Sequence, residues 1–182
     1  MSRIILLLRG VNVGGHRKVP MEQLRQTCRD IGFGDVESYI QSGNLVVTAP
    51  GGADEAAAML EAALQQRFGF AVDVIARTAR QWAAYAAGSP FPDAAEKQPN
   101  LLHLALSKQK PRPGAVAALR ERASAGELIE AAGDALWVLY SNGVAGTKLG
   151  PAVLDKAVGS PVTARNWRTV LKLHELVKGL PA

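Results

Sequence analysis

The sequence predicts a mixed α+β protein made of two similar halves followed by a helix. Two observations support this. In residues 3–77, apolar periodicity and turn residues give the order strand, helix, strand, strand, helix, strand. The same order returns about ninety residues further along, which indicates an internal duplication. Because this order is the split βαβ pattern, we expect a tandem duplication of two ferredoxin-like (βαββαβ-type) units plus a C-terminal helix.

The first half begins with a nearly continuous apolar run at residues 4–9, typical of a strand buried on both faces at the centre of a sheet. Pro20 opens a helix, and Ser42-Gly43 suits a two-residue hairpin connection. Asp54 is expected to cap the second helix. The predicted strands are 4–9, 36–41, 44–49 and 71–76, and the predicted helices are 21–31 and 54–68.

The second half repeats the order, with a hairpin around Gly133-Asp134. The predicted strands are 101–106, 127–132, 135–140 and 161–164, and the predicted helices are 113–122 and 151–158. We expect three parts, namely a first subdomain at 1–78, a helix and linker at 79–99, and a second subdomain with the C-terminal helix at 100–182.

Two helices lie outside the repeated pattern. One is expected at 78–87, capped by Thr78, before a proline-rich linker at 88–99. The other is expected at 166–178, with Asn166 as its N-cap. Its apolar stripe consists of Trp167, Val170, Leu171, His174 and Val177.

Composition is that of an ordinary globular chain, with 48% apolar and 20% charged residues. A net charge of +5 and a pI of about 9.6 permit an anionic partner without requiring one. The single Cys28 excludes a disulfide within one chain, and no paired metal-ligand spacing occurs, so we expect no metal and no cofactor. The apolar run at 4–8 is too short for a signal peptide or a membrane span, so we expect a cytoplasmic protein without a membrane partner.

The connection at residues 10–19 is the best candidate for a binding site. It is long for a strand-to-helix loop and contains three glycines, Asn12 and several basic residues. Glycines let the backbone approach a ligand, successive N–H groups can hold an anion, and Arg9 and Lys18 add charge beside a helix N-terminus. The string RGVNVGGHRK is neither a Walker loop nor a dinucleotide fingerprint. A surface loop with solvated charges is the alternative.

Two further segments have similar chemistry. The loop at 141–149 combines glycines with Lys148. The segment at 163–168 places Arg165 and Arg168 at the N-terminal end of a helix that begins at Asn166, where an exposed cation costs about 0.3 to 1 kcal/mol. A bound anion would relieve this cost, and an internal salt bridge is the alternative.

Catalytic patterns are weak. His103 and His174 fit packed, hydrogen-bonded positions better than catalytic ones. Ser42 lies in a turn, not in the strand-to-helix elbow of a hydrolase. Tyr39, Gln41 and Asn44 flank this turn and either contact a ligand or serve the turn alone. The central strands IILLLR and NLVVTA lack the aromatic residues on which RNA bases stack, so nucleic-acid binding would be electrostatic.

Four strings resemble the bacterial family known as domain of unknown function 1697 (DUF1697). They are LLRGVNVGGHRKVPMEQLR, YIQSGNLVV, GTKL and TARNWRTVLKLHEL. The resemblance extends over nearly the whole chain and implies a tandem α+β architecture, but it implies no substrate, cofactor or catalytic residue. Many of the signature positions are polar loop residues, which favours a shared binding site over packing alone. These positions are Arg9, Gly10, Asn12, Gly14, Gly15, Lys18, Gln41, Ser42, Gly43, Asn44, Lys148, Arg165, Asn166, Trp167 and Lys172.

Three functional hypotheses follow. The favoured hypothesis is that the glycine-rich basic loop binds a small anionic ligand. This ligand carries a phosphate or carboxylate group, and a nucleotide is one example. The others are non-specific nucleic-acid binding through a basic surface and an enzyme of unassigned reaction. The predicted ligand-binding residues are Arg9, Asn12, Gly14, Gly15, Lys18, Gln41, Ser42, Asn44, Lys148, Arg165 and Asn166.

Overall fold

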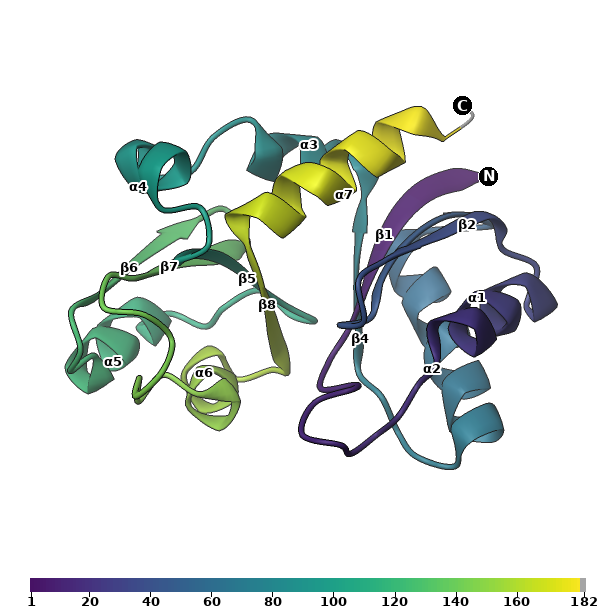
Figure 1. The fold of residues 1–182 in the computed structure, drawn as a ribbon, viewed down its shortest axis with the longest axis horizontal. Helices are drawn as coiled ribbons and strands as arrows, with labels where there is room; N and C mark the ends of the chain where they lie inside the picture. The colour runs from purple at the N-terminus through teal and green to yellow at the C-terminus, as the bar shows by residue number, and fades with distance from the viewer. Residues whose placement is uncertain (181–182) are drawn as a thin grey trace. The chain divides into compact units, whose positions relative to one another are not determined.

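A computed structural model describes residues 1–180 of the chain. It has a mixed α+β fold with two four-stranded antiparallel sheets (Figure 1). The chain divides into two compact units. The first unit comprises Met1–Ala84 and the segment from Lys172 onward, and the second unit comprises Tyr85–Leu171.

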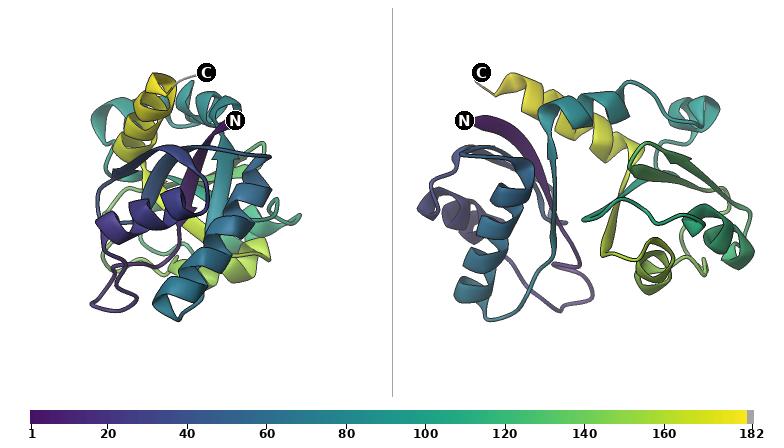
Figure 2. Two further views of the ribbon diagram at one scale, coloured as in Figure 1. Left: turned by 90° about the vertical axis from the view of Figure 1, so that its right-hand side faces the viewer. Right: turned by 180° about the vertical axis from the view of Figure 1, so that it is seen from behind.

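The first unit contains the sheet with strand order β2-β3-β1-β4. Helices α1 and α2 cover one face of this sheet (Figures 1 and 2). The elements are β1 (Ser2–Leu8), α1 (Met21–Asp30), β2 (Gly34–Tyr39), β3 (Asn44–Ala49), α2 (Ala53–Phe68) and β4 (Val74–Thr78). The sheet order places β1 at the centre, between β3 and β4, as the apolar run predicted.

Burial explains why β1 occupies the centre. All five residues from Ile4 to Leu8 are buried, so both faces of the strand are covered. On one face, Ile4, Leu6 and Leu8 join a core cluster with side chains of α1 and α2. An apolar strand of this kind is stable only in the interior of a sheet.

The second unit has the order β6-β7-β5-β8, which repeats the arrangement of the first sheet. Helices α5 and α6 lie on one face of this sheet (Figures 1 and 2). The elements are β5 (Leu102–Ser107), α5 (Ala115–Arg122), β6 (Glu127–Ala132), β7 (Ala135–Tyr140), α6 (Pro151–Val158) and β8 (Val162–Asn166). Strands β6 and β7 pair in an unbroken register around Gly133 and Asp134, as predicted.

Three helices complete the described chain: α3 (Ala79–Ala86), α4 (Pro92–Lys97) and α7 (Trp167–Gly179). The predicted linker at 88–99 contains α4. Pro92 occupies the first turn of α4, where proline is tolerated, and Ala94 is buried. Pro92, in a stretch whose prolines predict a loop, thus begins a short helix.

Two helix caps were predicted correctly. The hydroxyl of Thr78 accepts a hydrogen bond from the N–H of Gln81 at 3.2 Å, and the Gln81 side chain accepts one from the Thr78 N–H at 2.9 Å. This reciprocal pair is a capping box. Asn166 Oδ1 accepts a hydrogen bond from the N–H of Thr169 at 3.0 Å.

Two other helix predictions were wrong in detail. Asp54 does not cap α2, because the helix begins at Ala53 and Gly52 occupies the N-cap position. Asp54 lies in the first turn instead, where a negative charge still favours the helix dipole. On α7, Leu171 is 39% exposed whereas Leu173 is buried, so the buried stripe passes through Leu173.

The hairpin between β2 and β3 also differs from the prediction. Strand β2 ends at Tyr39, and the connection is 40–43 instead of the two residues Ser42-Gly43. Ile40 leaves the strand because its φ is +51°. The side chain of Asn44 closes the turn by donating to the carbonyl of Tyr39 at 3.0 Å.

Candidate functional site

Asn12 anchors the glycine-rich loop between β1 and α1. Its Oδ1 accepts a hydrogen bond from the N–H of Val19 at 2.8 Å, and its Nδ2 donates to the Val19 carbonyl at 2.9 Å. The same Nδ2 donates to the carbonyl of Gln41 at 2.8 Å. One neutral side chain therefore closes the loop and holds it against the hairpin turn.

The hairpin turn lies against the end of β1. The N–H of Leu8 donates to the carbonyl of Gly43 at 2.8 Å. Gly43 has φ +74°, and a Cβ atom here would lie 2.7 Å from Leu8 Cβ and 2.8 Å from Val11 Cγ2. Only glycine fits, both because L-residues rarely adopt this conformation and because the space is filled.

Asn44 is polar but fully buried. Besides its bond to Tyr39, its Nδ2 donates to Ser42 Oγ at 2.9 Å. Buried amides need such partners, and this one stabilises the turn. Among the predicted site residues of the turn, Gln41 is exposed, Ser42 is partly buried and Asn44 is enclosed.

The tip of the loop leaves its backbone open. Gly14 and Gly15 have φ values of +60° and +78°, and a Cβ atom at either would meet no other atom within 4 Å. The Asn12 N–H donates to the Arg17 carbonyl at 3.1 Å, which closes the loop from within. Asn12 and Arg17 themselves have positive φ, an uncommon conformation that concentrates at functional sites.

The loop also presents positive charge. Arg17 and Lys18 are exposed, and neither side chain has a hydrogen bond or an ion pair within residues 1–180. Arg9 is partly buried at the end of β1, and its N–H donates to the carbonyl of Asp73 at 2.9 Å. The first unit thus gathers one end of β1, the loop and the hairpin turn at one end of its sheet.

Arg165 lies in the second unit and is buried on β8. Its Nη1 donates to Thr163 Oγ1 at 2.7 Å and to the Ala164 carbonyl at 2.9 Å. Burial lowers the pKa of this guanidinium to about 10. Next to it, Asn166 caps α7 through its Oδ1.

Lys148 and Arg165 are not brought together within the second sheet. Lys148 is exposed and follows Thr147, whose hydroxyl donates to Glu127 at the start of β6. Strand β6 forms one edge of this sheet, and β8, which carries Arg165, forms the other.

Glu127 is a buried acidic residue that the sequence patterns did not single out. Its Oε2 accepts hydrogen bonds from the N–H groups of Ser124 and Ala125 at 3.1 and 2.8 Å, and its Oε1 accepts the Thr147 hydroxyl. The hydrogen bond from Thr147, with smaller contributions from the backbone N–H groups, lowers the pKa of Glu127 despite its burial. No local pattern in the sequence indicates the contact with Thr147, which is 20 residues away.

A repeated arginine was also missed, although the sequence contained a signal. Arg77 on β4 is buried, and its Nη1 donates to the Ala76 carbonyl at 2.8 Å, as Arg165 does to Ala164. Each arginine comes directly before a helix cap, Thr78 or Asn166. The strings Ala-Arg-Thr and Ala-Arg-Asn are therefore a repeated structural element.

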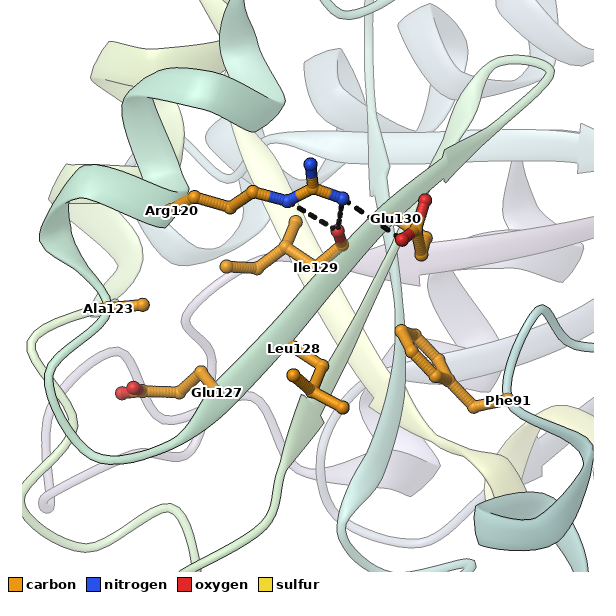
Figure 3. A pocket seen from close by; sticks show the side chains of 7 residues that line it. All are labelled: Phe91, Arg120, Ala123, Glu127, Leu128, Ile129 and Glu130. Carbon is orange, nitrogen blue, oxygen red and sulfur yellow. Dashed lines mark hydrogen bonds and ion pairs between the residues drawn. The ribbon is translucent and has the colours of Figure 1, made fainter.

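The second unit contains a hollow of about 310 Å³ along β6 (Figure 3). At one side of it, Arg120 Nη2 donates to the Ile129 carbonyl at 2.7 Å and to Glu130 at 3.0 Å. Leu128 and Phe91 line its apolar side. This volume is at the lower end of ligand pockets, and the one arginine in it is already paired.

Clusters of metal-ligating side chains and membrane-spanning helices are both absent from the described residues. Residues 1–180 contain no group of three or more His, Cys, Asp or Glu side chains that could hold a metal ion. Within the same range, none of the helices has the length and apolar character needed to cross a bilayer.

The two antiparallel sheets and the glycine-rich loop define an α+β protein with two compact units. A family model described as protein of unknown function, DUF1697, matches residues 1–137, more than half of the chain. The chain therefore belongs to the DUF1697 family. The matched range contains the glycine-rich loop and the hairpin turn, whereas Lys148 and Arg165 lie beyond it.

A conserved bacterial protein from Streptococcus pneumoniae has a similar solved structure. The two share 23% sequence identity with a TM-score of 0.76, over 97% of this chain and 98% of that chain. At this identity the likeness concerns the fold. No protein of curated function matches the chain.

Proposed function

We propose that the first unit binds a small ligand with a phosphate or carboxylate group at the glycine-rich loop. The observation that carries this proposal is the triple hydrogen bonding of Asn12, which fixes the loop against the turn at Gln41. A loop that is fixed before the ligand arrives loses less conformational entropy on binding.

The loop offers two kinds of anion-binding groups. Gly14 and Gly15 have no side chains to obstruct their N–H groups, so an anion can approach the backbone closely. Arg17 and Lys18 supply charges that no acidic group within residues 1–180 neutralises. The N-terminus of α1 begins nearby, and its N-cap residue Pro20 makes no capping hydrogen bond through its side chain.

The other predicted site residues take different parts in this proposal. Asn12 and Asn44 position the backbone, because their amides are already hydrogen-bonded within the loop and the turn. Gln41 and Ser42 flank the loop as further polar contacts. Lys148, Arg165 and Asn166 belong to the second unit, and their participation stays a prediction.

The experiment is a titration of the natural protein and two lysine variants with inorganic phosphate. Thermal unfolding at each phosphate concentration is the readout. Lys18→Ala removes a cation of the loop, and Lys178→Ala is the matched control. Lys178 lies on α7, close in sequence to Leu180. The Leu180 carbonyl accepts a hydrogen bond from Arg3, which is at the opposite end of β1 from the loop. At one hundred times its dissociation constant, the ligand adds about 2.7 kcal/mol to the free energy of unfolding.

We expect Lys18→Ala to weaken phosphate binding about tenfold, a loss of about 1.4 kcal/mol, and Lys178→Ala to leave it unchanged. Equal affinity in all three proteins would contradict the proposal. The same titration with a short DNA duplex at low and physiological salt tests the electrostatic alternative. Tight binding of DNA that collapses with salt, without any phosphate binding, would favour a nucleic-acid partner.

We also propose that the two units arose by duplication of one ferredoxin-like unit. The shared strand order and the repeated Ala-Arg-cap element at Arg77 and Arg165 support this. Superposing β1 to β4 on β5 to β8 in an experimental structure is the test. If the units are duplicates, superposing the strands also places the helices of one unit on those of the other. Helices on opposite faces of the superposed sheets would count against duplication.

A further inference from the structure

Two apolar side chains are exposed beside the basic loop. Val13 is 66% exposed at the tip of the loop, and Ile40 is 52% exposed in the hairpin turn. Val13 follows Asn12 in the sequence, and Ile40 precedes Gln41. Because Asn12 donates a hydrogen bond to the Gln41 carbonyl, the two segments adjoin. Exposed apolar groups gathered at one end of a unit indicate a contact surface more than scattered ones do.

Ile40 is also strained. Its φ of +51° lies in the left-handed region, where a β-branched residue is a genuine outlier. Asparagine or glycine would adopt this conformation at lower cost. Because the side chain is half exposed, core packing does not account for an isoleucine here. The strain therefore points to a contact that Ile40 makes with something outside the chain.

The charged side chains of the loop itself are basic. Arg17 and Lys18 are exposed on the same loop as Val13. Arg17 and Lys18 have no acidic partner within residues 1–180. The surface therefore combines an apolar part with a cationic part, and its complement is a molecule that is both apolar and anionic.

We propose that the ligand of the loop is an organic phosphate or carboxylate that carries an apolar group. The anionic group lies on the loop between the glycine N–H groups and Lys18, and the apolar group covers Val13 and Ile40. This inference rests on the proposed function of the same loop and specifies the class of ligand. Covering about 50 Å² of apolar surface at Val13 and Ile40 raises affinity about tenfold.

The test compares inorganic phosphate with phenyl phosphate by calorimetry on four proteins. These are the natural protein, Ile40→Asn, Val13→Ser and the control Val144→Ser. Asparagine tolerates the left-handed conformation, so Ile40→Asn removes the apolar contact without adding strain. Val144 is an exposed valine in the glycine-rich loop of the second unit. Val144→Ser is therefore the matched control for Val13→Ser.

We expect phenyl phosphate to bind the natural protein and Val144→Ser about tenfold more tightly than inorganic phosphate. In Ile40→Asn and Val13→Ser, we expect this preference to fall several-fold, while inorganic phosphate binds as before. Equal affinity for the two ligands in the natural protein would overturn the inference alone. Failure of inorganic phosphate to bind would overturn the proposed function, and the inference with it.

Discussion

The two glycine-rich loops of this protein are anchored by different chemistry. In the first unit, the neutral amide of Asn12 both donates and accepts, and it joins the loop to the turn at Gln41. In the second unit, the carboxylate of Glu127 only accepts, and it collects the hydroxyl of Thr147 and two backbone N–H groups. Each loop contains exposed lysine, Lys18 or Lys148.

This difference is the basis on which we propose the first loop, and not the second, as the anion site. A neutral anchor leaves the charges of Arg17 and Lys18 uncompensated, so the first loop presents a positive field. In the second loop, the buried carboxylate of Glu127 accepts a hydrogen bond from Thr147, the residue before Lys148. A negative charge is therefore held close to this lysine. The comparison therefore favours the first loop as the binding site and the second as a structural loop.

The largest expected effect concerns a pair of glycines with positive φ. Gly43→Ala forces a Cβ atom within 3 Å of Leu8 and Val11, whereas Gly146 in the second loop has φ +84° and open space around it. We expect Gly43→Ala to lower the free energy of unfolding by about 3 kcal/mol, from strain and overpacking together. Gly146→Ala loses only about 1 kcal/mol, from strain. Denaturant unfolding measures both, and equal losses would show that the turn does not pack against β1.

The second effect compares two asparagines. Asn12→Ala removes three hydrogen bonds and leaves the N–H of Val19 without its partner, so we expect a loss of about 2 kcal/mol. Asn142→Ala, in the second loop, removes one exposed bond to the carbonyl of Ala125 and costs less than about 1 kcal/mol. If Asn12→Ala cost no more than Asn142→Ala in denaturant unfolding, Asn12 would not be the anchor.

The third effect is smaller and depends on pH. The pKa of Glu127 is lowered in the folded protein, so its contribution to stability is present above its usual pKa of 4.5 and is lost as pH falls through the folded value. Glu127→Gln removes this dependence and costs about 1 kcal/mol at pH 7. Asn12→Ala keeps the acid dependence of the natural protein. Parallel pH profiles for Glu127→Gln and the natural protein would contradict the assigned role.

Much of the fold could be predicted from the sequence. The bounds of β3, β6, β7 and α6 were predicted correctly because glycine, proline or asparagine brackets each apolar run. Helix α4 was missed because six residues are too few to show helical periodicity. The end of β2 was misplaced because isoleucine favours strands, whereas Ile40 lies in the turn with a positive φ.

The candidate site was predictable only in part. Glycines and basic residues in one long loop pointed to residues 10–19, and the structure places the turn at Gln41 beside them. The contact between Glu127 and Thr147 was not predictable, because 20 residues separate them in the sequence. The polar character of Asn44 suggested a ligand contact, but burial gives this amide a structural partner in the turn.

The central claim is that the first loop binds an anion. The most direct test is a titration of the isotopically labelled protein with inorganic phosphate, in which NMR spectra monitor the backbone amide signals. If the first loop is the anion site, the signals of Gly14, Gly15 and Lys18 move first and saturate together. Signals of the second unit then remain in place. Changes confined to the residues around Lys148 or Arg165 would contradict the account and move the site to the second unit.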